Sequence, residues 1–99
     1  MTSLHYNRDR QDRENLIKEI GNGKVLDTFV VDKGHPKGPE LHEVTSTGIV
    51  NIYNYRTKKM VTKLIARPNQ LARYYGKGNV PKDLWKIAQE HQRKGYNEM

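Results

Sequence analysis

The sequence contains no cysteine, and this absence removes several classes of chemistry at once. Without thiols there can be no disulfide framework, no thiolate zinc site and no cysteine nucleophile. Apolar residues are also scarce: they make up 34% of the 99 residues, with a single phenylalanine and a single tryptophan. A chain of this length and composition can form one domain with one modest core.

No apolar run approaches the roughly 18 residues that a membrane-spanning helix needs, and residues 1–15 lack the apolar segment of a signal peptide. We therefore expect a cytoplasmic protein with no membrane partner, although a domain taken from a larger secreted protein would have the same features. The carboxylates are scattered rather than paired, and His35 and His42 have no further obvious ligands. Neither a metal-dependent nuclease nor any bound metal or cofactor is expected.

What the sequence has in excess is positive charge. Lysine and arginine number 18 against 11 acidic residues, which gives a formal net charge of +7. Residues 1–24 are nearly neutral, whereas nine basic residues between Arg56 and Lys86 accompany a single acid, Asp83. A clustered basic surface is typical of a protein that binds a polyanion. The alternative is a basic protein that has no such partner.

The residue pattern predicts an α+β fold, in which a four-stranded antiparallel sheet is packed by an N-terminal helix and two C-terminal helices. Apolar residues recur at helical spacing in three segments that end at glycine or begin near proline. These predicted helices are residues 12–20, 69–75 and 82–93. β-Branched and aromatic residues dominate four further segments. These predicted strands are residues 24–32, 41–45, 49–55 and 60–67, the last three forming a meander.

The single domain is expected to span residues 12–95, between a flexible N-terminus of residues 1–11 and a flexible C-terminus of residues 96–99. The predicted strand of residues 24–32 has apolar side chains on both faces. This favours a strand at the centre of the sheet, or one covered on both sides. The loop of residues 33–40, which contains two glycines and two prolines, then leads to the meander.

Two histidines, His35 and His42, lie in and just after this loop. Histidine titrates near neutral pH, so either residue could accept or donate a proton. Cleavage of RNA by its own 2′-hydroxyl needs a base, an acid and positive groups on the phosphate, but no metal. The histidines and the neighbouring basic, threonine and tyrosine residues could supply these groups. A pair of ordinary loop histidines fits the sequence equally well.

Arg56, Lys63 and Arg67 are the candidates for phosphate contact. Arg67 precedes a predicted helix, so its side chain could meet a phosphate held at the helix N-terminus. Lys63 falls in the middle of a predicted strand, where a lysine should point to solvent or into a groove. Arg56 shares a charged turn with Lys58 and Lys59, for which a solvated hairpin tip is the alternative.

Tyrosine is the one abundant aromatic residue, with six tyrosines against one phenylalanine. Four of them, Tyr53, Tyr55, Tyr74 and Tyr75, lie among the basic residues. Aromatic rings interleaved with lysine and arginine could stack on unpaired bases. Packing at the edge of the core is the alternative, and it suits at least half of them.

Four stretches carry a resemblance to a known family. They are KGHPKGPELHEVT (33–45), GIVNIYNYRTKKMVTKLIARP (48–68), QLARYY (70–75) and KIAQEHQRKGYN (86–97). Together they resemble the barnase–EndoU–colicin–RelE class of small ribonucleases, in particular its phage-associated members, over about two thirds of the chain. The fold of that class, with helices packed on an antiparallel sheet, agrees with the predicted order of elements.

The resemblance implies a metal-independent endoribonuclease of phage or mobile-element type, toxin-like, that cleaves RNA by 2′-OH transesterification. It implies a catalytic role for His42, with His35 as a second histidine and Tyr74 as a substrate or acid–base contributor. It implies phosphate contacts at Arg56, Arg67 and Lys63, and Arg73 is a fourth candidate for binding the substrate. The carboxylate base of barnase-like members has no counterpart here unless Glu40 or Glu43 serves.

Two other functions fit the same sequence. One is a module that binds nucleic acid through the basic face and performs no chemistry. The other is a small adaptor or inhibitor that docks on an acidic surface of another protein. The partners expected from the first hypothesis are RNA and, if the protein is toxin-like, a cognate immunity or partner protein.

Overall fold

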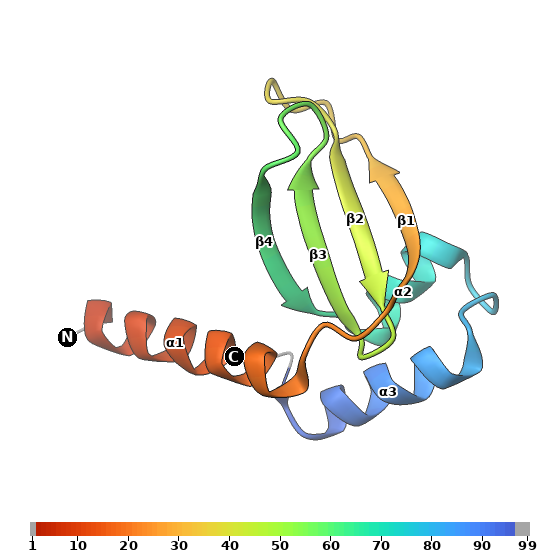
Figure 1. The fold of residues 1–99 in the computed structure, drawn as a ribbon. Coiled ribbons are helices and arrows are strands. Elements are labelled where there is room, and N and C mark those ends of the chain that lie inside the picture. Colours follow the sequence, from red (N-terminus) through yellow and green to blue (C-terminus); the bar gives the residue numbers. More distant parts are fainter. Residues whose placement is uncertain (1, 97–99) are drawn as a thin grey trace.

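A computed structural model describes the backbone of residues 2–96 and the side chains of residues 11–96 (Figure 1). The four strands form one antiparallel sheet in the order β1-β2-β3-β4. With the helices, the elements are α1 (Thr2–Ile20), β1 (Val25–Val31), β2 (Glu40–Thr45), β3 (Ile49–Asn54), β4 (Met60–Ile65), α2 (Pro68–Tyr75) and α3 (Lys82–Arg93). The predicted α+β architecture is confirmed.

The N-terminal helix begins at Thr2 rather than at residue 12, so it includes most of the segment predicted to be flexible. No glycine or proline interrupts residues 2–20, and a helix docked at one end can extend through a mainly polar segment of this kind. The Gln11 side-chain amide donates to Asn15 Oδ1 at 3.2 Å, a pair one turn apart. None of the described helices has the length and apolar character needed to cross a membrane.

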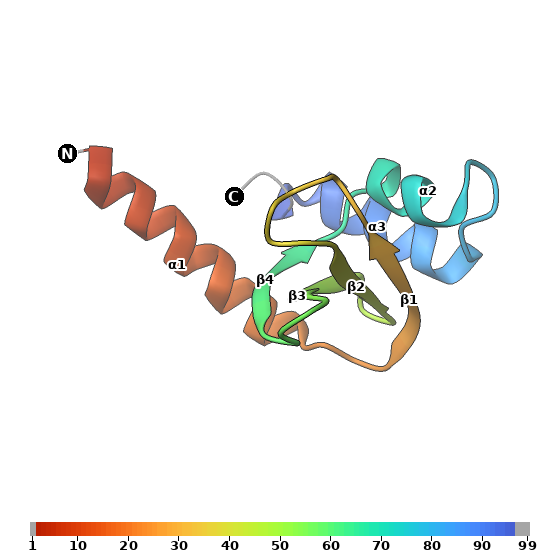
Figure 2. The ribbon, with the colours of Figure 1, turned by 90° about the horizontal axis from the view of Figure 1, so that it is seen from above.

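The core has two parts, one on each face of the sheet. Figure 2 shows α2 and α3 together on one side of the sheet. The larger part lies between the sheet and the two C-terminal helices, because alternation along β2 and β3 turns one set of side chains toward α2 and α3. Its buried members are Val44, Val50, Ile52, Ala66, Leu71, Leu84 and Ala88. The smaller part is formed on the other face by Ile17 of α1 with Ile49 and Ile65.

Tyr96 packs against this smaller cluster, although the sequence places it in a flexible C-terminus. The remainder of that predicted terminus, residues 97–99, lies outside the described residues. α1 contacts the sheet through its C-terminal end, beside β4, and the rest of this helix extends away from the sheet (Figure 1).

β1 is an edge strand, and the expectation of a central or doubly covered strand is wrong. It pairs only with β2, and Val25, Leu26 and Val30 are 44%, 42% and 57% exposed. Among the described residues, β2 is the one strand that pairs with β1. The helix that precedes β1, α1, lies beside β4 at the opposite edge of the sheet (Figure 1). Apolar residues on both faces of a strand therefore did not indicate burial here.

The β2–β3 turn is pinned to α3. Gly48 adopts the left-handed conformation predicted for a tight hairpin, with φ of +82°. A Cβ at this position would come within 3.2 Å of the side chains of Ile87 and His91. His91 Nε2 in turn donates a hydrogen bond to the Thr47 carbonyl oxygen at 2.9 Å. Helix and hairpin therefore hold each other in place.

Candidate functional site

Two of the three residues predicted to be catalytic, His42 and Tyr74, are in direct contact although they are 32 positions apart. His42 Nδ1 lies 2.6 Å from the Tyr74 hydroxyl, and the two rings meet edge to face with centroids 5.5 Å apart. Alternation along β2 places His42 on the face covered by α2, where it is only 5% exposed. Tyr74 projects from the last turn of α2.

Two further side chains extend this contact into a hydrogen-bonded chain. His42 Nε2 lies 3.1 Å from Glu40 Oε1, because residues two apart on a strand share a face. Gln70 lies one helical turn before Tyr74, and its Nε2 donates to the Tyr74 hydroxyl oxygen at 3.0 Å. We refer to Glu40, His42, Tyr74 and Gln70 as the relay.

The direction of each hydrogen bond in the relay follows from the donors available. The carboxylate of Glu40 can only accept, so His42 Nε2 carries a hydrogen and donates it. The Tyr74 oxygen accepts from Gln70, which leaves its own hydrogen for His42 Nδ1. Burial raises the pKa of Tyr74, the hydrogen bond from Gln70 lowers it, and the charge of Glu40 raises it, with a net increase. Tyr74 is therefore a neutral hydroxyl donor at physiological pH.

The relay is buried at His42 and more exposed at its Glu40 end. The His42 side chain is 6% exposed, whereas that of Glu40 is 33% exposed. Phe29 of β1 stacks on Tyr74 with ring centroids 5.1 Å apart and covers it further. Because a carboxylate has more lone pairs than the His42 bond uses, Glu40 retains room to accept a second hydrogen bond. Glu40 is thus the member of the relay best placed to meet a substrate.

The third predicted catalytic residue, His35, is not part of the relay. It lies exposed in the loop between β1 and β2, where its carbonyl oxygen accepts a hydrogen bond from Gly38 N at 2.9 Å. The structure therefore separates the two histidines that the sequence grouped together. His35 occupies a turn, and His42 occupies the covered face of a strand.

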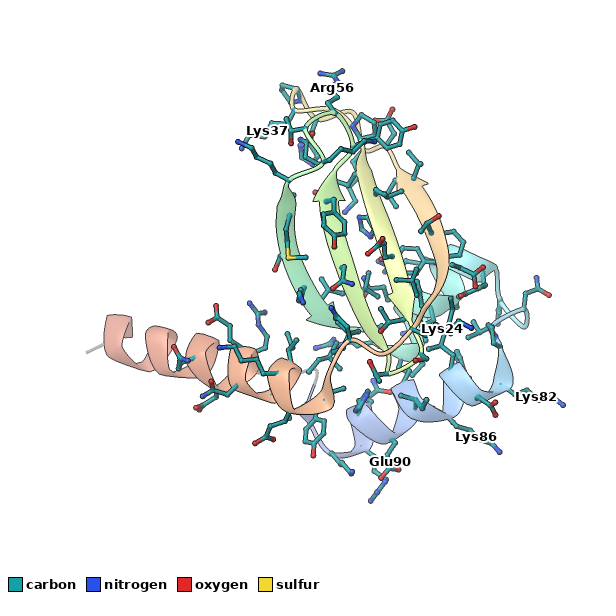
Figure 3. All side chains as sticks on the ribbon, viewed as in Figure 1. Lys24, Lys37, Arg56, Lys82, Lys86 and Glu90 are labelled. Carbon is teal, nitrogen blue, oxygen red and sulfur yellow. The ribbon has the colours of Figure 1, made fainter. Side chains whose placement is uncertain are left out.

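The four predicted substrate-binding residues lie in three places. Arg67 immediately precedes α2 and Arg73 lies in its last turn, so both border the helix that carries Tyr74. Arg56 lies at the β3–β4 hairpin tip, against Gly38 of the β1–β2 loop (Figure 3). Lys63 pairs with Asn51 across β3 and β4 on the face opposite the relay, and it lines a groove of about 630 Å³ beside α1. This position agrees with the predicted groove-facing lysine.

Lys63 belongs to a second polar group, which we call the open-face row and define as Glu43, Asn51, Tyr53 and Lys63. Strand register aligns Glu43 with Asn51 and Asn51 with Lys63. Asn51 is 3% exposed; its Nδ2 is 3.5 Å from Glu43 Oε1, and its buried Oδ1 has no protein partner. Burial raises the pKa of Tyr53, and the charge and hydrogen bond of Glu43 raise it further.

Gln70 and Asn51 were not among the candidate residues predicted from the sequence, and Glu40 had only a conditional role there. Local spacing did contain part of the signal, since Glu40 and His42 are two apart on a strand and Gln70 and Tyr74 are four apart on a helix. Nothing local, however, connects a strand pair to a helix pair. That connection depends on how α2 packs on the sheet.

Among residues 11–96, no three histidine or acidic side chains come together in a group that could hold a metal ion. The side chains of the relay are a carboxylate, an imidazole, a phenol and an amide, which can exchange hydrogen bonds and, at the first three, protons. Comparison of the chain with protein-family models, with curated proteins and with solved structures finds no match. The ribonuclease resemblance accordingly stays a prediction.

Proposed function

We propose that this protein is a metal-independent endoribonuclease that cleaves RNA through its own 2′-hydroxyl, with the relay as its acid–base group. The observation that supports this most is the continuous chain from Glu40 through His42 to Tyr74. A carboxylate held by an imidazole, which is in turn held by a neutral hydroxyl, is an arrangement suited to proton transfer. Its more exposed end is a carboxylate that an incoming hydroxyl can reach.

Glu40 acts as the general base in this proposal. It takes the proton of the ribose 2′-hydroxyl as that oxygen attacks the adjacent phosphorus, and the bond from phosphorus to the 5′-oxygen breaks. Glu40, now protonated, returns this proton to the departing 5′-oxygen, so the products carry a 2′,3′-cyclic phosphate and a 5′-hydroxyl and the carboxylate is restored. His42 keeps the Glu40 carboxylate oriented, and Tyr74 keeps His42 in the tautomer that donates to Glu40.

Arg67 and Arg73 are the phosphate contacts in this scheme. Both border α2, which carries Tyr74 and Gln70. A guanidinium can bind a phosphate through two parallel hydrogen bonds and can stabilise the charge that develops on it. The net charge of +7 would also draw a polyanion to the protein before any specific contact forms.

A second candidate is a nucleic-acid-binding module that performs no chemistry. The observation that favours it is the burial of His42, whose side chain is only 6% exposed and so has little access to a substrate. In that case the relay would serve only to fix α2 on the sheet, and the same basic surface would bind RNA without cleaving it.

The test is incubation of the purified protein with a mixed RNA pool in EDTA, comparing wild type with Glu40→Gln and Glu43→Gln. Both variants remove one carboxylate from β2, but from opposite faces of the sheet. We expect wild type and Glu43→Gln to produce 2′,3′-cyclic phosphate ends, and Glu40→Gln to be slower by about 100-fold or more.

Thermal unfolding of each variant would confirm that the fold is retained. If Glu43→Gln abolished cleavage and Glu40→Gln did not, the catalytic carboxylate would lie on the open face, and the relay would not be catalytic. Intact RNA that shifts on a gel at low salt, and less so at high salt, would instead support the binding module.

A further inference from the structure

The only tryptophan of the chain, Trp85, lies on the outer side of α3 and is half-buried. Helical spacing places Lys82, Trp85, Lys86 and Gln89 together on this side, opposite the residues of α3 that are buried against the sheet. The face of a helix that points away from the core is mainly polar, so a large aromatic ring between two lysines gives this face an unusual combination of side chains.

Trp85 forms part of the wall of a groove of about 360 Å³ between α3 and the segment that connects it to α2. The groove is lined by Gly78, Val80, Lys82, Trp85, Lys86 and Gln89. Gly78 has a φ of +83°, and no atom lies within 4 Å of the place where a Cβ would be, so the connecting segment leaves open space at this point. The volume is within the range of sites that bind small molecules.

The charged residues that line this groove are the two lysines, Lys82 and Lys86, whereas the neighbouring acid Asp83 lines a different pocket, on the side of α3 that faces β1. Lys82 and Lys86 point away from the body of the protein (Figure 3), and Lys77 is exposed in the connecting segment. Farther along α3, the Glu90 carboxylate is occupied by ion pairs with Arg93 and Lys94. An aromatic wall with lysines beside it matches a ligand that combines a flat ring with negative charge.

We propose that this groove binds an unpaired nucleotide of a single-stranded nucleic acid, with its base stacked on Trp85 and its phosphates held by Lys82 and Lys86. Every base has a flat π face, so such a site tolerates different sequences, and the lysines follow the backbone. The inference extends the nucleic-acid part of the proposed function but needs no cleavage.

The position of the groove is consistent with one strand passing both sites. α2 and α3 lie side by side and are joined by the connecting segment (Figures 1 and 2). Arg73 lies in the last turn of α2, next to Tyr74 in the chain, and Lys77 lies in the segment that connects α2 to α3. A strand whose reacting phosphate lies near Glu40 could therefore continue along these cations to the groove.

Because Trp85 is the only tryptophan, its intrinsic fluorescence reports on this groove alone. The probe is a ten-nucleotide oligodeoxyadenylate, which lacks the 2′-hydroxyl and cannot be cleaved by the proposed mechanism. We expect saturable quenching, with an affinity that falls as salt is raised. The double variant Lys82→Gln/Lys86→Gln should lower the slope of log affinity against log salt by about 1.4, as expected for two phosphates on a single strand.

The matched control is Lys33→Gln/Lys37→Gln, which makes the same charge change in the β1–β2 loop and should leave the slope within about 0.5 of wild type. Trp85→Ala, followed by anisotropy of a labelled oligonucleotide, should weaken binding roughly 5- to 150-fold, the range expected for one stacked base.

Three results would overturn this inference: no quenching at oligonucleotide concentrations that saturate the anisotropy signal, equal quenching by inorganic polyphosphate, or quenching by polyglutamate but not by the oligonucleotide. The second would mean a cation site without stacking, and the third an acidic protein partner. The oligodeoxyadenylate cannot be cleaved by the proposed mechanism, so its quenching tests this site alone, and failure of the proposed catalysis and failure of this site can be distinguished.

Discussion

The two faces of the sheet carry similar polar residues in opposite states. β2 contributes one glutamate to each: Glu40 on the face covered by helices and Glu43 on the open face. On the covered face both ring nitrogens of His42 have partners, and the chain continues to Gln70. On the open face the buried Oδ1 of Asn51 has no protein partner. The relay is a complete network, whereas the open-face row lacks a donor for Asn51 Oδ1.

This difference has an energetic meaning. Removing one member of a complete buried network lowers the free energy of unfolding strongly, because each remaining partner stays desolvated but loses its hydrogen bond. An incomplete network already carries this desolvation cost, about 1–3 kcal/mol for one unpaired buried group. Deleting a member of the relay should therefore destabilise the protein, whereas deleting the unpaired group of the open-face row should not.

The largest effect is expected for His42→Ala. The substitution leaves the Tyr74 hydroxyl without its acceptor and Glu40 without its donor, and it opens a cavity beneath α2. We therefore expect a loss of about 2–4 kcal/mol in the free energy of unfolding. Urea denaturation followed by circular dichroism measures this. His35→Ala, in an exposed loop, is the matched control and should change stability by less than about 0.5 kcal/mol. Equal effects for the two histidines would show that the relay does not stabilise the fold.

A smaller effect is expected for Tyr74→Phe, and it should depend on pH. The folded protein holds the pKa of Tyr74 above the usual value of about 10, because burial disfavours the phenolate. The folded state therefore keeps this proton at a pH where the unfolded chain has lost it. The resulting stability is fully present below pH 10 and is lost as pH rises through the folded pKa, by up to about 1.4 kcal/mol per pH unit.

Urea midpoints measured at pH 8, 10 and 11 would test this difference. Wild type should lose stability over this range, and Tyr74→Phe should lose less, after allowing for its lower stability at pH 8. Tyr53→Phe is the counterpart on the open face. Because the pKa of Tyr53 is also raised, removing this phenol should likewise reduce the loss of stability between pH 8 and pH 11. A slope unchanged by Tyr74→Phe would mean that the phenol is solvated in the folded protein.

The elements that sequence predicted well are those whose signals are local. α3 has the predicted bounds because an apolar stripe lies between Pro81 and Gly95. The start of α1 was missed because a helix without an apolar face leaves no periodic signal. The edge position of β1 was missed because apolar content does not report which strands are neighbours. In the relay, His42 and Tyr74 were found as separate candidates, but their contact depends on tertiary packing.

The smallest change in stability is expected for Asn51→Leu, which replaces an amide whose buried Oδ1 has no partner, and whose Nδ2 has only a long 3.5 Å contact with Glu43, by an apolar group of similar size. Removing a buried acceptor that has no partner can be neutral or stabilising, so we expect a change within about 0.5 kcal/mol of wild type, or a gain. Asn54→Leu is the matched control on the same strand. Its Oδ1 accepts hydrogen bonds from the backbone N–H groups of Arg56 and Thr57 at 2.9 and 3.0 Å.

Asn54→Leu should therefore cost about 1–3 kcal/mol, because two turn donors lose their acceptor. If Asn51→Leu proved as costly as Asn54→Leu, the Asn51 oxygen would have a partner in solution, such as an ordered water, and the contrast between the two faces would fail. If it is neutral and the variant still binds RNA as wild type does, the open-face row is structural. Neutral stability combined with weaker RNA binding would mean that RNA supplies the missing donor.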